Sequence, residues 1–490
     1  MDESVDGSRT DLTWLRGSSV LVTGARVSGL AVVQPLLDLG AAVTVTDSNR
    51  GALDEAANIG AAVVLQEDLL GDPAVLAEFS LVVTSPGFRP DSPVLAAATE
   101  RGIPVWGDVE LCWHIDRAEL YGPRTRWLVV TGTNGKTTTT SMLASILEAA
   151  DIESVACGNI GLPIADALRR TPHPSVLAVE LSSFQLFWAP SVRPAAGVVL
   201  NIAEDHLDWH GGMDGYVQAK ARALTGDVAV VGLDDARAAS LAAGSPAPGV
   251  VGFRLGEPAS GELGVRAGVL VDNAFGENVE LLAADDVEPS GPSGILDALA
   301  AGALARSVGV QAAAVRAGLL SYRVGPHRAA VVRELGGVTF VDDSKATNPH
   351  AARSSILAHE RVVWIAGGLL KGAVIDDLVV EIADRLVAAV VLGRDGMQIA
   401  QALARHAPDV PVVRLPSGDD AGVTHGAEDA DAVMRVVVAQ AAGHAAPGDT
   451  VLLAPAAASL DMFADYGHRG RSFAESVQRL GVDDIGSSRS

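Results

Sequence analysis

The stretch from Gly132 to Thr138 reads Gly-Thr-Asn-Gly-Lys-Thr-Thr and lies between a predicted strand that ends at Val130 and a predicted helix that begins at Thr137. Glycines let a backbone wrap closely around phosphate, and the N–H groups of the loop and of the helix terminus face the anion. Lys136 can reach the β- and γ-phosphates of a nucleotide, and the Thr137 hydroxyl can bind Mg²⁺. The first glycine of the common phosphate loop would stand at Val130, so this loop is shorter. Its strand–loop–helix setting still predicts an ATP-dependent enzyme.

Acidic and basic side chains follow the next predicted strands. Glu180 comes directly after a Val-rich strand, and His206 follows the strand after it within a short acidic run. Because the carboxyl ends of parallel strands meet at one sheet edge, Glu180 and His206 could bind a metal ion there. The alternative for Glu180 is a helix start capped by Ser182 or Ser183. Lys220 lies in a helical segment, and taken alone it is best interpreted as a solvated surface lysine.

A third group of candidate residues lies in the last third of the chain. The run Asp342-Asp-Ser-Lys-Ala-Thr-Asn348 follows a predicted strand, and we expect it to open a helix that Asp343 or Ser344 caps. Lys345 in this run and Lys371 after the next predicted strand each offer a cation. If the two lysines stand at adjacent strand ends, they favour capture of an anionic substrate. Each lysine taken singly is better interpreted as a surface residue.

A glycine turn near the N-terminus resembles a dinucleotide-binding fingerprint. Gly24-Ala-Arg-Val-Ser-Gly29 follows a strand and precedes a helix, and Asp47 stands where an acid that binds ribose is expected. The second glycine of the fingerprint is replaced by Arg26, which weakens the case for NAD. A structural turn is one interpretation, and a different nucleotide bound with altered geometry is the better functional one.

Short β-branched runs alternate with helical patterns along most of the chain, which predicts parallel sheets covered by helices. We divide this α/β chain into three domains, 1–122, 123–324 and 325–490. The Gly-rich stretch 246–292 predicts short strands and loops. The other predicted strands are 20–23, 42–46, 63–65, 81–84, 127–130, 176–179, 197–200, 228–231, 338–341, 362–366, 388–392, 412–414 and 450–453.

Composition narrows the class of protein. The 490 residues are 48% hydrophobic and 20% charged, which is typical of globular domains. A net charge of −24 argues against nonspecific binding to nucleic acid or anionic lipid. Cys112 and Cys157 fit neither a disulfide framework nor a zinc motif, so we expect buried, reduced thiols. The polar N-terminus is unlike a signal peptide, and the absence of a long apolar run leads us to expect a soluble protein without membrane insertion, in the cytoplasm.

Taken in order, these motifs resemble the Mur ligase family of peptidoglycan synthesis, and the resemblance covers nearly the whole chain. It implies a Rossmann-like N-terminal domain, a central P-loop ATPase-like domain with a parallel sheet, and a Rossmann-like C-terminal domain. The motifs that carry it are Gly132-Thr-Asn-Gly-Lys-Thr137, Glu180-Leu-Ser-Ser-Phe-Gln185, Asn201 with Asp205-His206, Ala219-Lys220, Gly325-Pro-His-Arg328, Asp343-Ser-Lys-Ala-Thr-Asn348 and Pro455 to Phe463. Ser85-Pro-Gly87 and Gly107-Asp-Val-Glu110 are also similar to the family's first domain.

The resemblance implies an activity, its cofactors and its substrates. It implies ATP-dependent addition of D-glutamate to UDP-N-acetylmuramoyl-L-alanine through an acyl phosphate, catalysed by a monomer. It further implies two Mg²⁺ ions, the first near Thr137 and Glu180 and the second served by His206 and a carbamylated Lys220. The residues implied for ATP are Gly132, Thr133, Asn134, Gly135, Lys136, Thr137, Thr138, Arg328 and Asp343. Those implied for the UDP substrate are Ser28, Asp47, Ser48, Asn159, Ser182 and Gln185, and those for D-glutamate are Lys345, Thr347, Lys371, Ser459 and Tyr466.

Three positions depart from the family pattern. The element Gly-x-His-Asn-x-x-Asn reads Gly291-Pro-Ser-Gly-Ile-Leu-Asp297 here, so its His and both Asn are lost. Tyr466 stands where a Phe is expected near D-glutamate. Asp47-Ser-Asn49 replaces Asp-Thr-Arg at the uracil site.

Three other functions fit these motifs less well. A folylpolyglutamate-type ligase shares the phosphate loop and the modified lysine, but it has no need of a UDP-binding first domain. A nucleotide-binding regulator without catalysis would not need Glu180, His206 and Lys220 together. An NAD oxidoreductase needs the glycine that Arg26 replaces.

Overall fold

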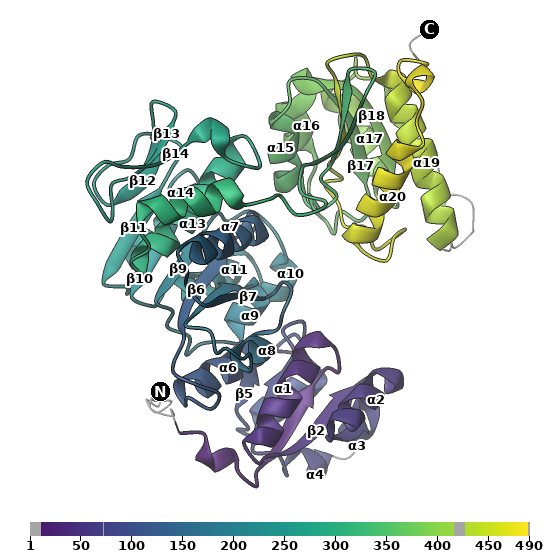
Figure 1. Ribbon diagram of the computed structural model, residues 1–490. Coiled ribbons are helices and arrows are strands. Elements are labelled where there is room, and N and C mark those ends of the chain that lie inside the picture. Colours follow the sequence, from purple (N-terminus) through teal and green to yellow (C-terminus); the bar gives the residue numbers. More distant parts are fainter. Residues whose placement is uncertain (1–10, 72, 416–426, 489–490) are drawn as a thin grey trace. The chain divides into compact units, whose positions relative to one another are not determined.

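The structure is a computed structural model that describes residues 11–71, 73–415 and 427–488. Its strands form three separate sheets, each accompanied by its own helices (Figure 1). The chain divides into two compact units. One runs to Val287 and resumes over Ile295–Tyr322, and the other comprises Glu288–Gly294 and the chain from Arg323 onward. Two of the sheets lie in the first unit and the third lies in the second.

The first sheet has five parallel strands in the order β3-β2-β1-β4-β5. Helices α1 (Val27–Asp38), α2 (Arg50–Ile59), α5 (Pro93–Glu100) and α6 (Asp108–Arg117) connect or follow these strands. The strand order reverses between β1 and β4, which is where open sheets of this kind form a ligand crevice. The strands are β1 (Ser19–Thr23), β2 (Ala42–Asp47), β3 (Ala62–Leu65), β4 (Leu81–Thr84) and β5 (Val105–Gly107).

The second sheet has nine strands in the order β14-β13-β12-β11-β10-β9-β6-β8-β7. Its β12, β13 and β14 are antiparallel neighbours, and the pairings from β7 across to β12 are parallel. The strands are β6 (Arg126–Thr131), β7 (Ser154–Gly158), β8 (Val176–Glu180), β9 (Ala196–Val199), β10 (Val228–Gly232), β11 (Gly249–Phe253), β12 (Glu262–Arg266), β13 (Val269–Asp272) and β14 (Val279–Ala283). The helices that matter below are α7 (Lys136–Ala149), α9 (Ser183–Phe187), α10 (Leu207–His210), α11 (Met213–Ala221), α13 (Pro292–Ser307) and α14 (Ala312–Ser321).

Burial explains why the central strands read as continuous apolar runs. Leu128, Val129 and Val130 of β6 are fully buried, because β6 pairs with β8 on one side and β9 on the other and has helices on the sheet faces. The loop after β6 therefore follows a strand that is held in place by a neighbouring strand on each side. Both cysteines are buried and free, as predicted.

The third sheet has six strands in the order β15-β16-β20-β17-β18-β19. All neighbours are parallel except β15 and β16. Helices α15 (Pro349–Leu357), α16 (Asp376–Ile382) and α17 (Gly396–His406) share one core with the sheet, and α19 (Ala427–His444) and α20 (Tyr466–Gln478) share the core of the other face. The strands are β15 (Ala330–Leu335), β16 (Val338–Asp342), β17 (Val362–Gly367), β18 (Leu386–Leu392), β19 (Val412–Arg414) and β20 (Thr450–Leu453).

The predicted strands are all present, with ends shifted by two residues or fewer. Three strands were not predicted: β5, which has only three residues; β7, which is interrupted by small residues; and β15, which is exposed at the sheet edge. The predicted cap of the helix after β16 was wrong. That helix is α15, which begins at Pro349, and Asn348 caps it by accepting from the Ala351 N–H at 2.9 Å.

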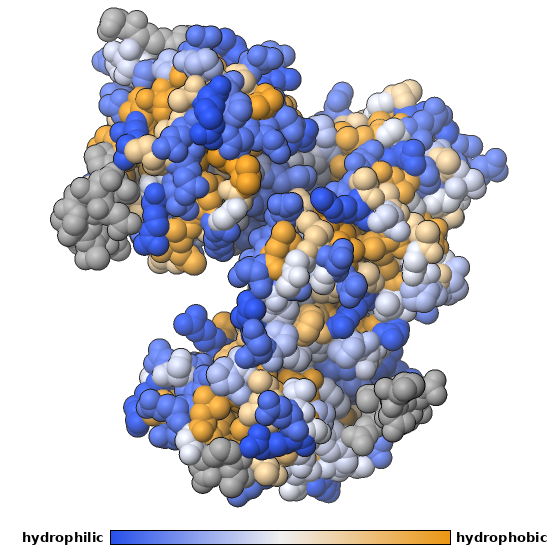
Figure 2. Space-filling view, turned by 180° about the vertical axis from the view of Figure 1, so that it is seen from behind, coloured by the Kyte–Doolittle hydropathy of each residue, from blue (hydrophilic) through white to orange (hydrophobic). Residues whose placement is uncertain are grey.

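Exposed hydrophobic residues lie in small groups among hydrophilic ones on the face drawn in Figure 2. Within the described residues, no helix is both long and apolar enough to span a bilayer.

Candidate active site

The phosphate loop is held in shape by Asn201, at the carboxyl end of the neighbouring strand β9. Its Oδ1 accepts from the Asn134 N–H at 2.9 Å and its Nδ2 donates to the Asn134 carbonyl at 3.2 Å. The Asn201 carbonyl also accepts from the Thr133 N–H at 2.9 Å. Gly135 caps helix α7 with a φ of 83°, a left-handed conformation that glycine adopts without strain. Contacts within the protein thus define the conformation of the loop.

Lys136 lies across this loop. Its ammonium donates to the carbonyl oxygens of Gly132 at 3.0 Å and Thr133 at 2.9 Å. Thr137 and Thr138 follow it in the first turn of α7, where the helix N-terminus favours negative charge. The arrangement gathers the lysine, the hydroxyl and the backbone donors that binding of a triphosphate needs.

Lys220 is 1% exposed, so the interpretation of it as a surface lysine was wrong. It projects from α11 toward the phosphate loop, where its Nζ donates to the Gly132 carbonyl at 2.7 Å and lies 4.7 Å from the Tyr216 ring centre. Burial, and secondly the nearby charge of Lys136, hold the pKa of Lys220 well below the usual lysine range. The Tyr216 hydroxyl in turn lies 2.9 Å from Thr133 Oγ1, so α11 is bonded to the loop at two points.

Glu180 ends β8 and is 1% exposed. Its Oε1 accepts from Asn159 Nδ2 at 2.9 Å, whereas its Oε2 is buried without a hydrogen-bond partner. Because Glu180 pairs in register with Val130, it stands beside the strand that leads into the phosphate loop. Burying a carboxylate oxygen that accepts no hydrogen bond costs free energy unless a cation binds to it. Glu180 therefore has the character of a metal ligand.

Among the residues described, no group of three or more His, Cys, Asp or Glu side chains is arranged to hold a metal ion. Mg²⁺ takes one or two protein carboxylates together with substrate phosphates and water. Glu180 and Thr137 carry the kinds of oxygen, carboxylate and hydroxyl, that one such ion would take. His206 and Lys220 fit a second ion only if Lys220 carries a negative charge, since an amine that donates to a carbonyl offers no anion.

His206 occupies the position before α10 with a φ of 53°, a left-handed conformation that is uncommon for a non-glycine residue. Its ring lies 4.7 Å from that of Phe184, and its Nε2 is 3.4 Å from Asp205. His210, one helical turn later, has its pKa lowered to about 4 by burial and by the charges of His206 and Lys220. Its Nε2 lies 2.9 Å from Ser183 Oγ, which ties α10 to α9.

Ser182 caps α9, as one of the two interpretations of this segment predicted, and Gln185 completes a capping box with it. Gln185 is buried, and its Oε1 accepts from the Ser182 N–H at 3.0 Å. The side chain therefore has a structural role in addition to any contact with substrate.

The N-terminal glycine turn and Asp47 lie together. The Asp47 carboxylate accepts from the N–H groups of Ala25 at 2.8 Å and Asn49 at 2.9 Å, which holds Ser48 beside the turn. Ser28 stands in the first turn of α1. The structure thus brings together the three residues predicted for the uridine end of a substrate.

Asp108 was not singled out from the sequence, although its motif was. Its Oδ1 is buried without a hydrogen-bond partner, and burial raises its pKa to about 6 against the opposing effect of Ser28 and Gln185 nearby. Asp108 therefore lies near Ser28 of α1 and Gln185 of α9, two residues predicted for the UDP substrate.

In the second unit, the Lys345 ammonium lies 4.0 Å from the centre of the Tyr466 ring. This is a cation–π distance, and it brings together two residues predicted for D-glutamate. Asp343 lies close to Arg328, and burial raises its pKa to about 6. Thr347 follows in the same loop, with its N–H donating to the Lys345 carbonyl at 2.8 Å.

The expectation that Lys345 and Lys371 follow adjacent strands was wrong. Strand β20 pairs with both β16 and β17 and lies between them. The loop after β20 carries Ser459, and it joins the Lys371 loop through hydrogen bonds between Leu369 and Ala458 at 2.8 and 2.9 Å. Three loops, not two, therefore bring Lys345, Thr347, Lys371 and Ser459 to one edge of this sheet, whereas Tyr466 lies on α20.

Arg469 of α20 joins the same three loops and was missed in the sequence. It is 1% exposed and donates to Ser344 Oγ and carbonyl at 3.0 and 2.8 Å, to the Gly367 carbonyl at 3.3 Å and to the Ala457 carbonyl at 3.1 Å. No signal in the sequence sets Arg469 apart, because His468 and Arg471 beside it on the same helix are also basic.

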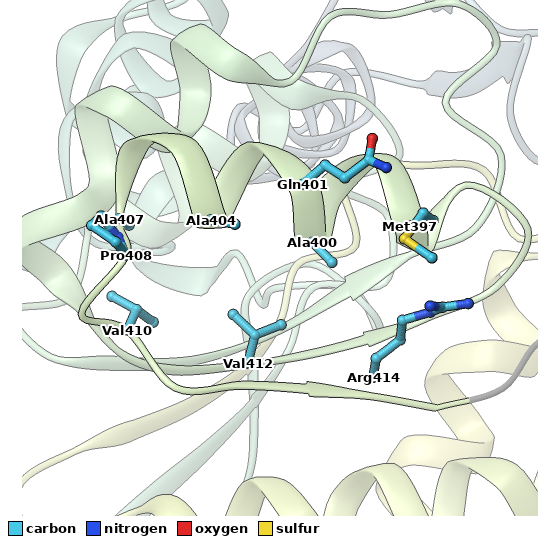
Figure 3. A pocket seen from close by; sticks show the side chains of 9 residues that line it. All are labelled: Met397, Ala400, Gln401, Ala404, Ala407, Pro408, Val410, Val412 and Arg414. Atoms are coloured by element: carbon cyan, nitrogen blue, oxygen red, sulfur yellow. The ribbon is translucent and has the colours of Figure 1, made fainter.

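A separate hollow lies between α17 and β19 (Figure 3). Ala and Val side chains form most of its wall, with Gln401, Met397 and Arg414 at one end. It contains none of the predicted site residues and no group of reactive side chains.

Comparison with known proteins gives matches along most of the chain. Residues 18–107 match the model of the Mur ligase MurD-like N-terminal domain, 130–288 the Mur ligase middle domain, and 327–457 the Mur ligase glutamate ligase domain. The UDP-N-acetylmuramoylalanine--D-glutamate ligase of Rhodococcus jostii (strain RHA1) is 66% identical over 487 residues, covering 97% of this chain and 98% of the relative. The enzyme of that name from Nocardia farcinica (strain IFM 10152) is 63% identical over 478 residues, covering 97% and 99%.

A solved structure also matches. The UDP-N-acetylmuramate-alanine ligase from Thermotoga maritima aligns with a TM-score of 0.58 at 18% identity, covering 94% of this chain and 99% of that one. At this identity the match concerns the fold alone.

Proposed function

This chain belongs to the Mur ligase family and is an ATP-dependent ligase, and from that premise we propose that it joins D-glutamate to UDP-N-acetylmuramoyl-L-alanine. The reaction gives ADP and phosphate and is a cytoplasmic step of peptidoglycan synthesis. Relatives that carry this substrate pair in their names match almost the full length of the chain, which supports the proposal.

The chemistry begins with activation of a carboxylate. An alanyl carboxylate oxygen attacks the γ-phosphorus of ATP, the bond to the ADP oxygen breaks, and an acyl phosphate forms. Lys136 and the N–H groups of the phosphate loop stabilise the charge on the transferring phosphoryl group. The amine of D-glutamate then attacks the acyl carbon and loses a proton, and phosphate leaves with the electron pair of the C–O bond.

Magnesium fits the site in the way described above, with Thr137 and Glu180 as protein ligands of one ion and His206 with modified Lys220 at the other. When bound, Mg²⁺ supplies positive charge to the phosphate oxygens. Within the protein, Glu180 holds Oε2, which has no hydrogen-bond partner, beside the phosphate loop. Asn159 fixes the other oxygen, Oε1, by a hydrogen bond.

Lys220 is proposed to be carbamylated. Its buried amine has no carboxylate within ion-pair distance among the described residues, and its contacts are the Gly132 carbonyl, Thr131 Oγ1 and the Tyr216 ring. A neutral amine attacks the carbon of CO₂ and releases a proton to solvent, which converts a cation into an anion. That anion is what a metal ion beside His206 requires.

The remaining assignments follow the grouping of residues in each unit. We assign the UDP substrate to the first sheet and to Asn159, Ser182 and Gln185, within a Rossmann-like domain over 1–122 and a P-loop ATPase-like domain over 123–324. The last domain, 325–490, is Rossmann-like. It contributes Arg328 and Asp343 to ATP, and Lys345, Thr347, Lys371, Ser459 and Tyr466 to D-glutamate. The active form is a monomer.

The observation that carries the proposal is the cluster of Lys136, Lys220 and Glu180 around one phosphate loop. The test is phosphate release from ATP with UDP-N-acetylmuramoyl-L-alanine and a panel of amines: D-glutamate, L-alanine and diaminopimelate. Of the three amines, we expect only D-glutamate to support phosphate release. We expect Lys136→Ala to release no phosphate with any of them. Equal release with another amine, or release by Lys136→Ala at the wild-type rate, would overturn the proposal. A folylpolyglutamate-type ligase would show no dependence on the UDP substrate.

A further inference from the structure

Asp297 lies behind the phosphate loop, on α13. It is the last residue of the element Gly291–Asp297, where the family pattern has Asn. Only 7% of it is exposed. Helix α13 is not part of the β6–loop–α7 segment, so Asp297 reaches the loop from a different element.

Two contacts define its position. Its Oδ1 accepts from Thr139 Oγ1 at 3.0 Å, and Thr139 is a fully buried residue in the first turns of α7. The same oxygen lies 2.3 Å from the point that a Cβ on Gly135 would occupy. The carboxylate therefore touches the backbone of Gly135 and bonds to a residue four positions later.

Gly135 and Thr139 lie at the two ends of the first turn of α7, which contains residues predicted to contact the nucleotide. The Thr139 N–H donates to the Gly135 carbonyl at 2.9 Å, and Lys136 and Thr137 lie between them. Asn201 fixes the loop at Asn134 from one side, as described above. Asp297 does the same for Gly135 and Thr139 from the helix side.

We propose that Asp297 is a positioning residue of the phosphate loop, which acts on the triphosphate through Thr139 and Gly135 and not on the base of the nucleotide. The inference rests on the proposed function in taking ATP as the substrate. Its basis is the location of Oδ1, which is directed at the loop backbone and engaged by Thr139.

The test separates the phosphates from the base. Affinities for ATP, ITP and inorganic tripolyphosphate are measured by calorimetry on the full chain in Mg²⁺ buffer. Loss of a buried hydrogen bond to a charged group corresponds to roughly a 10- to 100-fold change in affinity. We expect Asp297→Ala and Thr139→Val each to weaken all three ligands by a common factor in this range.

Conservative variants and a double variant complete the design. The amide oxygen of Asp297→Asn can still accept from Thr139, so we expect affinities within about threefold of wild type. Asp297→Ala/Thr139→Val should lose no more than either single variant, because both remove the same contact. The matched control is Ser145→Ala. This hydroxyl also lies on α7 but donates to the Gly318 carbonyl at 2.9 Å, away from the loop, and its loss should leave all three affinities unchanged.

A base contact would give a different result. The inference is overturned if Asp297→Ala weakens ATP but leaves tripolyphosphate unaffected, or if Thr139→Val binds all three ligands as wild type does. Thr139→Val is nearly isosteric, so it keeps the test valid if Asp297→Ala fails to fold. Because binding is measured without turnover, the result does not depend on which amine the enzyme accepts.

Discussion

The ammonium groups of Lys136 and Lys220 donate to the same acceptor, the carbonyl oxygen of Gly132, at 3.0 and 2.7 Å. Two cations on one carbonyl repel each other, and Lys220 is the more deeply buried of the two. The proton is therefore disfavoured on Lys220, and its pKa is low because of burial first and Lys136 second. The pair places an amine of low pKa next to the lysine that we propose to bind phosphate.

The first prediction concerns CO₂. We expect activity to fall when dissolved CO₂ is removed at constant pH, and to return on addition of bicarbonate, because Lys220 would then regain the proposed carbamate. Native mass spectrometry should show the mass of one added CO₂. Lys220→Arg, which keeps a cation that cannot form a carbamate, should be inactive with or without bicarbonate. Full activity of CO₂-free enzyme that lacks the added mass would contradict the carbamate.

Glu180→Gln tests the role of Oε2, the buried oxygen of Glu180 that has no hydrogen-bond partner. The amide oxygen can still accept from Asn159, but the charge is lost, so we expect kcat to fall by about 100- to 1000-fold with little change in stability. The measurement is phosphate release as a function of Mg²⁺ concentration, in which the variant should need more Mg²⁺. The control is Glu204→Gln, an exposed glutamate in the loop after β9. Unchanged kcat in Glu180→Gln would remove this residue from the reaction.

Local sequence patterns were sufficient to place the phosphate loop. A glycine loop between an apolar strand and a helix is a short-range feature, so Gly132 to Thr138 could be located without knowing the rest of the fold. Glu180 and His206 could be placed at a sheet edge for the same reason, because each follows a buried strand.

What failed depended on contacts distant in sequence. The burial of Lys220 arises from packing of α11 against the phosphate loop, whose Gly132 lies 88 positions earlier. No local pattern of hydropathy or charge around Lys220 signals this burial. The order of β16, β20 and β17 arises because the last strand of the sheet inserts between two earlier ones. Arg469 bonds to backbone carbonyls of three loops, and backbone acceptors leave no mark in side-chain sequence.

Arg469→Lys tests the hydrogen bonds by which Arg469 connects the loops that follow β16, β17 and β20. Lysine has fewer donors on a flexible stem, so carbonyls of Gly367 and Ala457 lose partners in the interior. We expect the free energy of unfolding of the second unit to fall by about 2–4 kcal/mol and KM for D-glutamate to rise more than KM for ATP. Urea unfolding followed through Trp364, which is fully buried in this unit, provides the first measurement. Arg471→Lys, an exposed neighbour on α20, should change neither quantity.

The last prediction uses the pH dependence of stability. Burial raises the pKa of Asp108 to about 6 from an ordinary 3.8, so the folded chain binds this proton more tightly than the unfolded chain does. The resulting stabilisation is complete below pH 3.8 and is lost as pH rises through 6, by at most about 3 kcal/mol.

The variant Asp108→Asn tests this dependence, because its side chain cannot ionise. We therefore expect it to unfold at higher urea than wild type at pH 7, with the advantage shrinking toward pH 4. Asp54→Asn, which removes an exposed carboxylate of α2, is the control. A difference between wild type and Asp108→Asn that stays constant from pH 4 to 7 would show that Asp108 does not titrate in this range. The same variant assayed for KM of the UDP substrate reports whether its position between Ser28 and Gln185 matters for binding.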